Sequence, residues 1–170
     1  VAYTNCNEVE LFHNGKLQGR RKLEKHGHGE WEVPYAPGYI EAVAYRGGNE
    51  VARDKRVTAG KPHRLMLELQ NPDVKANGKD IAIFDCYVVD ENGIEVPDCS
   101  AVVDFLAEGA GRVYSTGSDV SDHGSLFSPT RKMRAGRIGV AVKTGKTSGA
   151  LRLIATADGL LPAVYTVEIQ

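Results

Sequence analysis

The sequence predicts an all-β protein built from two consecutive immunoglobulin-like β-sandwich domains. Hydrophobic residues alternate with polar ones along most of the 170 residues, and no helical period persists long enough to indicate a helix. The chain contains 19 glycines, above the usual share of about 7 %, and glycine suits turns because it adopts positive φ without a steric cost. In the second half, turn residues recur about every 8–12 residues, which is the spacing of an immunoglobulin-like sandwich.

The first domain is predicted to span residues 1–60 and to be small. Its strongest local signal is Asn14-Gly15, because a type I′ hairpin turn needs positive φ at both central residues. About five strands are few for an independent sandwich. Either a strand is missing upstream and the domain is incomplete at its N-terminus, or the domain is stabilised by contacts with the domain that follows it. The expected strands are 1–4, 8–13, 16–23, a short one containing Trp31 and Val33, 39–46 and 50–58.

The second domain is predicted to span residues 64–170, after a boundary punctuated by Gly60 and Pro62. About seven strands are expected, separated by turns. The polar segment 117–131 has no period and is expected to be a long loop. The Cys–Trp–Cys core of antibody domains is absent, so the pattern predicts the architecture only. The expected strands lie at 65–69, 80–90, 103–107, from 113 onward, 138–142, 151–155 and 164–169.

Charge and composition disfavour several functional classes. The 21 Lys and Arg residues nearly balance the 22 Asp and Glu residues, and the net charge of −1 argues against nucleic-acid binding, which needs a basic face. No apolar run approaches the ~18 residues of a membrane helix, so we expect no membrane insertion. Three cysteines without a close pair argue against a disulfide framework or a cysteine-ligated zinc. Val1 begins inside an expected strand, which indicates a piece of a longer chain.

The sequence shows no catalytic constellation. Acidic residues fall in expected turns or at outward strand positions, where solvated surface charge is the simpler interpretation. Nucleophile-elbow, phosphate-loop and dinucleotide motifs are absent, and we expect no cofactor. The best metal-like cluster is Asp119, Asp122 and His123 in the 117–131 segment. It has neither EF-hand nor zinc spacing, and a plain polar loop is the alternative.

Sugar binding is the other chemistry that the sequence suggests. Trp31, Tyr35 and Tyr39 lie close together in the chain, followed by Tyr45. Exposed aromatic faces can stack on pyranose rings, whereas aromatic residues of a short-strand domain usually fill its core. We therefore treat Trp31, Tyr35 and Tyr39 as candidate carbohydrate-binding residues, with core packing as the alternative.

Specific segments resemble a known enzyme family along essentially all of the chain. The first half resembles a module that follows the catalytic barrel in bacterial β-galactosidases of glycoside hydrolase family 2. The second half resembles the next C-terminal domain of that family. The segments that carry the resemblance are 1–6, 8–12, 14–16, Gly19, 31–35, 37–38, 41–45, 51–54 and 58–60 in the first half, and 77–82, 88–93, 96–97, 108–112, 131–132, Gly136, 153–157 and 159–160 in the second.

This resemblance implies a non-catalytic C-terminal fragment of a family 2 glycosidase, with a β-galactosidase as the parent enzyme. In the family, both catalytic glutamates lie on a TIM barrel upstream of these modules, so no catalytic residue carries over to this chain. The implied partners are that barrel and the N-terminal β domains of the parent. A bacterial periplasmic, secreted or cell-surface location follows by the same resemblance. Residues 116–119 depart from the Asn-Gly-Asp-Pro common in the family, which removes support for a ligand role of that loop.

Two other functions remain open from the sequence. The chain could be a carbohydrate-binding module that holds the parent enzyme on a glycan substrate. It could instead be an adhesive or spacer domain of the immunoglobulin type, which fits the fold but explains none of the family segments.

Overall fold

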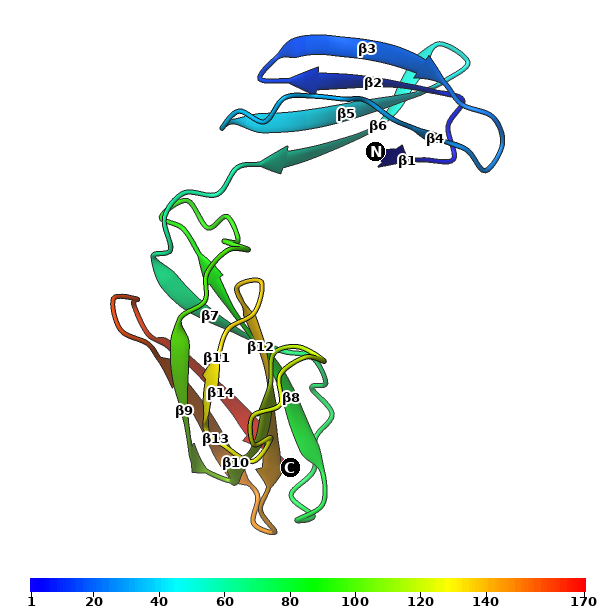
Figure 1. The fold of residues 1–170 in the computed structure, drawn as a ribbon. Helices are drawn as coiled ribbons and strands as arrows, with labels where there is room; N and C mark the ends of the chain where they lie inside the picture. Colours follow the sequence, from blue (N-terminus) through cyan, green and yellow to red (C-terminus); the bar gives the residue numbers. More distant parts are fainter. The chain divides into compact units, whose positions relative to one another are not determined.

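The computed structural model describes residues 1–170 and contains fourteen β-strands and no helix, which confirms the all-β prediction. The chain divides into two compact units, Val1–Thr58 and Ala59–Gln170. Each unit is described by itself below, and Figure 1 labels its strands. No helix in the structure could span a membrane.

The first unit is built around one antiparallel sheet with the strand order β3-β2-β5-β6. The Asn14-Gly15 turn joins β2 to β3, and its φ angles of 49° and 78° are those that a type I′ turn requires. The outermost strand β6 is exposed along its whole length. The bounds are β2 (Glu8–His13), β3 (Lys16–Lys22), β5 (Tyr39–Arg46) and β6 (Asn49–Val57).

A short second ladder covers one part of this sheet. It pairs β1 (Ala2–Tyr3) with β4 (His28–Gly29). The small core beneath it is formed by Cys6, Val9 and Ala44, and Trp31 packs against that core.

The prediction of a strand at Trp31 and Val33 is wrong, because the extended pairing occurs earlier, at β4. Trp31 instead folds its indole onto two glycines. Its Nε1 donates a hydrogen bond to the carbonyl oxygen of Gly19 at 3.2 Å. A Cβ atom added to Gly29 would lie 2.6 Å from the Cζ3 atom of Trp31. The absence of a side chain at Gly29 therefore makes room for the indole, and the residues around Trp31 follow that packing rather than a ladder.

The second unit is a sandwich of two four-stranded sheets, ordered β10-β12-β8-β7 and β11-β9-β13-β14. Apart from β11, these orders are compatible with the ABED and CFG sheets of immunoglobulin-like domains. The strands are β7 (Arg64–Leu69), β8 (Ile81–Val89), β9 (Val102–Gly109), β10 (Gly111–Gly117), β11 (Thr130–Lys132), β12 (Arg137–Thr144), β13 (Gly149–Thr156) and β14 (Ala163–Ile169).

The core of the sandwich comes from the alternating inward residues of its strands. On β8, Phe84, Cys86 and Val88 are fully buried, and the facing sheet contributes Leu151 and Leu153 from β13. Burial raises the pKa of the Cys86 thiol to about 12. Cys86 therefore behaves as a small hydrophobic core residue.

The second unit has one strand more than the sequence pattern indicates. The extra strand, β11, lies at the end of the segment expected to be a loop and pairs with β9, with Arg131 opposite Val103. Arg131 is only 5 % exposed. Its inward side chain is charged, so the usual alternation of hydrophobic and polar residues does not mark this strand.

Candidate functional site

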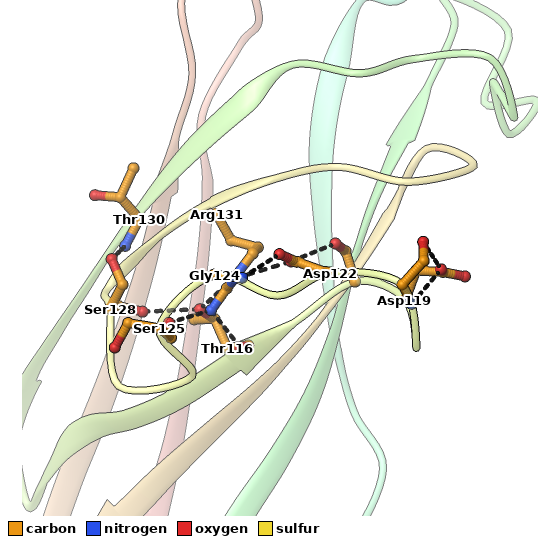
Figure 2. Close-up of polar contacts among 10 residues, drawn as sticks. Thr116, Asp119, Asp122, Gly124, Ser125, Ser128, Thr130 and Arg131 are labelled. Carbon is orange, nitrogen blue, oxygen red and sulfur yellow. Dashed lines mark hydrogen bonds and ion pairs between the residues drawn. The ribbon is translucent and has the colours of Figure 1, made fainter.

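The segment between β10 and β11 folds around the buried Arg131, as Figure 2 shows. The Nε atom of Arg131 donates to the Thr116 hydroxyl at 3.1 Å, and Nη2 donates to the Thr116 carbonyl oxygen at 3.0 Å. Nη2 also donates to the carbonyl oxygen of Ser125. Nη1 forms an ion pair with the Asp122 carboxylate at 2.8 Å. One guanidinium thus ties the end of β10 to two points of the loop.

Asp122 is part of this network. Its Oδ2 accepts hydrogen bonds from Arg131 and from the Ser118 hydroxyl, the latter at 3.1 Å. Its Oδ1 accepts from the Gly124 amide at 3.0 Å. The Gly124 amide, together with Ser118 and Arg131, lowers the pKa of the Asp122 carboxyl below its usual value. The carboxylate is therefore ionised at neutral pH and serves as the counter-ion of Arg131.

The other two candidate metal ligands lie in the same loop but do not join Asp122 around a common centre. The Asp119 carboxylate accepts hydrogen bonds from the hydroxyl and the amide of Ser121, and these bonds lower its pKa. His123 is exposed. Nowhere in residues 1–170 do three His, Cys, Asp or Glu side chains form a group that could hold a metal ion.

The candidate sugar-binding aromatic residues are divided between two hollows of the first unit. Trp31 borders a hollow of about 880 Å³ together with Arg21 and His28. Tyr35 and Tyr39 line a separate hollow of about 240 Å³. The structure therefore brings Tyr35 and Tyr39 together and leaves Trp31 apart from them.

Within the smaller hollow, the two tyrosines differ in how freely they could meet a ligand. Tyr35 is 80 % exposed. The ring of Tyr39 is partly occupied by Lys55, whose Nζ lies 3.7 Å from the ring centroid. Tyr35 is thus the more accessible stacking surface.

Some acidic side chains of each unit form ion pairs with an arginine on the neighbouring strand. Arg20 pairs with Glu8 and Glu10 in the first unit. Arg152 pairs with Glu108 at 2.8 Å in the second. Such cross-strand pairs stabilise sheet surfaces and do not resemble two carboxylates that flank a substrate bond.

The sequence analysis missed an exposed hydrophobic surface on the Arg131-bound loop. Leu126 and Phe127 are 57 % and 70 % exposed, and the ring of Phe127 meets that of Tyr114 at a centroid distance of 5.6 Å. The available signal was an adjacent Leu-Phe pair inside an otherwise polar segment.

Comparison with known proteins identifies the family of the chain. A family model described as glycoside hydrolase family 2 C-terminal domain 5 matches residues 65–166, more than half of the chain. The chain belongs to glycoside hydrolase family 2. A second model, described as a domain of unknown function (DUF4982), matches residues 1–52 of this family 2 chain. The resemblance inferred from sequence segments is confirmed.

Individual relatives extend the similarity over the whole family 2 chain. It is 33 % identical to the β-galactosidase BoGH2A of Bacteroides ovatus, over 99 % of this chain and 20 % of the relative. It is 27 % identical to a β-glucuronidase of Formosa agariphila, over 97 % of this chain and 17 % of the relative.

A solved family 2 member from Bacteroides cellulosilyticus superposes with a TM-score of 0.92 and 31 % identity, covering 98 % of this chain and 22 % of that one. The chain thus spans about a fifth of the length of the relatives it matches. It is a C-terminal accessory region and forms part of a larger enzyme with other domains.

Proposed function

We propose that the chain is the non-catalytic C-terminal region of a β-galactosidase that hydrolyses terminal β-galactosides, and that its two units support the catalytic barrel and the N-terminal β domains of that enzyme. The observation that carries this proposal is the extent of the similarity. It covers 99 % of the chain but only 20 % of a β-galactosidase. The hydrogen-bonded carboxylates of Asp90 and Asp122, which are held by turn amides and by Arg131, also support a structural role.

The test compares the parent enzyme with a version that lacks residues 1–170, and with the chain alone. We expect the parent to hydrolyse a chromogenic β-galactoside faster than the matching β-glucuronide. The chain alone should hydrolyse neither. The truncated enzyme should lose thermal stability more than its KM for the small substrate changes. Hydrolysis by residues 1–170 alone would overturn the non-catalytic role, and a preference of the parent for the β-glucuronide would overturn the galactosidase assignment.

A second candidate function, carbohydrate binding, is favoured by the exposed ring of Tyr35 beside Tyr39. An aromatic face at the edge of a hollow suits stacking on a sugar ring. Under this alternative, titration with galactose or lactose shifts the amide NMR signals of residues near Tyr35. The variant Tyr35→Ala abolishes the shifts, whereas Tyr3→Ala does not, although Tyr3 is equally exposed at 81 %. A flat titration at millimolar sugar would remove the binding function and leave the structural one.

A further inference from the structure

The Arg131-bound loop carries a compact hydrophobic surface in the second unit. We define the Phe127 surface as Tyr114, Leu126 and Phe127, whose exposed fractions are 37 %, 57 % and 70 %. The rings of Tyr114 and Phe127 meet edge to face, with an interplanar angle of 77°. Single exposed hydrophobic residues are common on protein surfaces, whereas clusters of exposed hydrophobic side chains are typical of contact sites.

The Phe127 surface is fixed in place from both sides. Tyr114 lies at a β-bulge, because Val113 pairs with Val142 and Ser115 pairs with Ala141, so Tyr114 itself has no partner on β12. Bulges re-aim a side chain relative to the regular alternation of a strand. The edge strand β10 therefore presents the Tyr114 ring to the loop.

Hydrogen bonds hold the loop against β10 at the same place. The Thr116 amide donates to the Leu126 carbonyl oxygen at 2.9 Å, and the Thr116 hydroxyl donates to the Ser128 carbonyl oxygen at 2.8 Å. Arg131 then anchors Thr116 from inside the unit. A loop that only connected two strands could leave Leu126 and Phe127 free to fold inward, whereas this one holds them outward in a defined position.

The charges around the surface indicate the chemistry of the partner. Arg112 and Lys143 lie opposite each other on β10 and β12, 5.9 Å and 5.6 Å from the centroid of the Tyr114 ring. Neither cation forms an ion pair in the structure, unlike Arg131, Arg137 and Arg152. A complementary surface would therefore be hydrophobic at its centre and carry carboxylates at its rim.

The part of the parent enzyme that lies outside residues 1–170 is the partner that the length of that enzyme favours. About four-fifths of the similar β-galactosidase lies outside the matched region, which is 20 % of its length. A covalently attached partner is present at a high effective concentration. Such a partner can cover a hydrophobic surface without a separate bimolecular binding step. Building on the proposed accessory function, we propose that the Phe127 surface docks against the rest of the parent polypeptide, on a hydrophobic patch rimmed by carboxylates.

Hydroxyl-radical footprinting of the intact parent enzyme tests this docking without any substitution. Leu106 is the internal reference, because it is 56 % exposed and Leu126 is 57 % exposed. Docking predicts that Leu126 and Phe127 are oxidised about fivefold or more slowly than their exposure relative to Leu106 implies, since interface centres exclude water. Oxidation of Leu126 at the rate of Leu106 would overturn the proposal.

A matched pair of variants of the parent enzyme gives a second measurement. Leu126→Asp combined with Phe127→Asp should speed proteolytic release of the C-terminal region by about tenfold, the loss typical of a central hydrophobic contact. Leu106→Asp should leave that rate unchanged. Equal release rates in both variants would contradict docking.

The footprinting also distinguishes other partners. Protection of Leu126 and Phe127 that disappears on dilution, together with a dimer-to-monomer shift, would assign the surface to a second copy of the chain. Protection seen only with added lactose would assign it to a glycan. Each of these outcomes overturns the proposal, while glycosidase activity of the same preparation reports separately on the proposed function.

Discussion

Arg131 combines burial with a complete set of partners. Its guanidinium contacts a hydroxyl, two carbonyl oxygens and a carboxylate, and a planar fork of donors can satisfy several acceptors in fixed directions. A lysine would offer one compact ammonium group at the same place. The conformation of the 117–131 segment therefore depends on the shape of the Arg131 side chain as well as on its charge.

Replacement of Arg131 should destabilise the second unit strongly. We expect Arg131→Met to lower the free energy of unfolding by about 2–4 kcal/mol, because the buried Thr116 and the partly buried Asp122 lose their hydrogen-bond partner. Arg131→Lys should cost about 1–2 kcal/mol. The control is Arg152→Met, which removes an exposed ion pair of the same 2.8 Å length and should cost at most about 0.5 kcal/mol. Urea denaturation measures all three, and equal losses for Arg131→Met and Arg152→Met would contradict this role.

Acid should lower the free energy of unfolding by protonating a carboxylate that is held in a turn, that of Asp90. The Asp90 side chain is 4 % exposed and accepts backbone amides from Gly60, Ile94 and Asn92 at 2.7, 2.9 and 2.9 Å. These bonds, that of Gly60 foremost, lower the pKa of Asp90. Because the folded pKa lies below the unfolded value of about 3.9, the stabilisation is complete above that pH and is lost as the pH falls through the folded pKa.

The expected result is a free energy of unfolding that stays level from about pH 7 to pH 5 and declines below about pH 4. Asp90→Asn should be less stable than wild type at neutral pH and should show a shallower acid decline, because the amide does not titrate. Urea titrations at several pH values give both curves. An unchanged acid slope in Asp90→Asn would show that other carboxylates carry the effect.

At the scale of single elements, local turn chemistry was the most informative part of the sequence. The Asn14-Gly15 signal gave the β2–β3 hairpin with its strand limits close to those expected, because the φ requirement is set by two adjacent residues. The strand predicted at Trp31 does not form. The pairing of β1 with β4 and the fit of the indole over Gly29 depend on residues that a short window of sequence does not include. The sequence did not predict β11 for a related reason, because the inward residue of that strand is a buried arginine.

The packing of Trp31 on Gly29 can be tested by a substitution that adds one methyl group at position 29. Gly29→Ala should displace the indole, because the added Cβ would lie 2.6 Å from its Cζ3 atom. Trp31 is the single tryptophan of the chain, so we expect its fluorescence to shift to longer wavelength and the first unit to unfold at a lower urea concentration. Gly117→Ala is the control, since no atom lies within 4 Å of its added Cβ, and it should leave the emission unchanged. An unshifted emission maximum in Gly29→Ala would contradict the packing described.

At the scale of the whole molecule, the two units differ greatly in how much they bury. The core of the second unit contains a large set of buried residues from both sheets, whereas the main cluster of the first contains Cys6, Val9 and Ala44. Stability of small domains is limited by the surface they can bury. The boundary predicted near residues 60–64 remains a prediction, and unfolding of the chain would test whether the two parts behave independently.

We therefore expect the chain to unfold in two steps. Fluorescence of Trp31 reports on the first unit alone, while far-UV circular dichroism reports on the strands of both. The fluorescence midpoint in urea should come at a lower concentration than the main circular dichroism transition, because the smaller core stabilises less. Coincident transitions would mean that the two parts unfold as one cooperative unit.

The sequence by itself determined the fold class, most strand positions and the enzyme family. The first two depend on alternation of residues and on turn residues, which are properties of neighbours along the chain, and the third depends on matched segments. Tertiary structure alone decided that Asp122 is bound by Arg131, that Trp31 lies apart from Tyr35 and Tyr39, and that Leu126 and Phe127 face outward beside Tyr114. These outcomes depend on burial and on contacts between distant residues, and neither is encoded in the order of residue types within a short window.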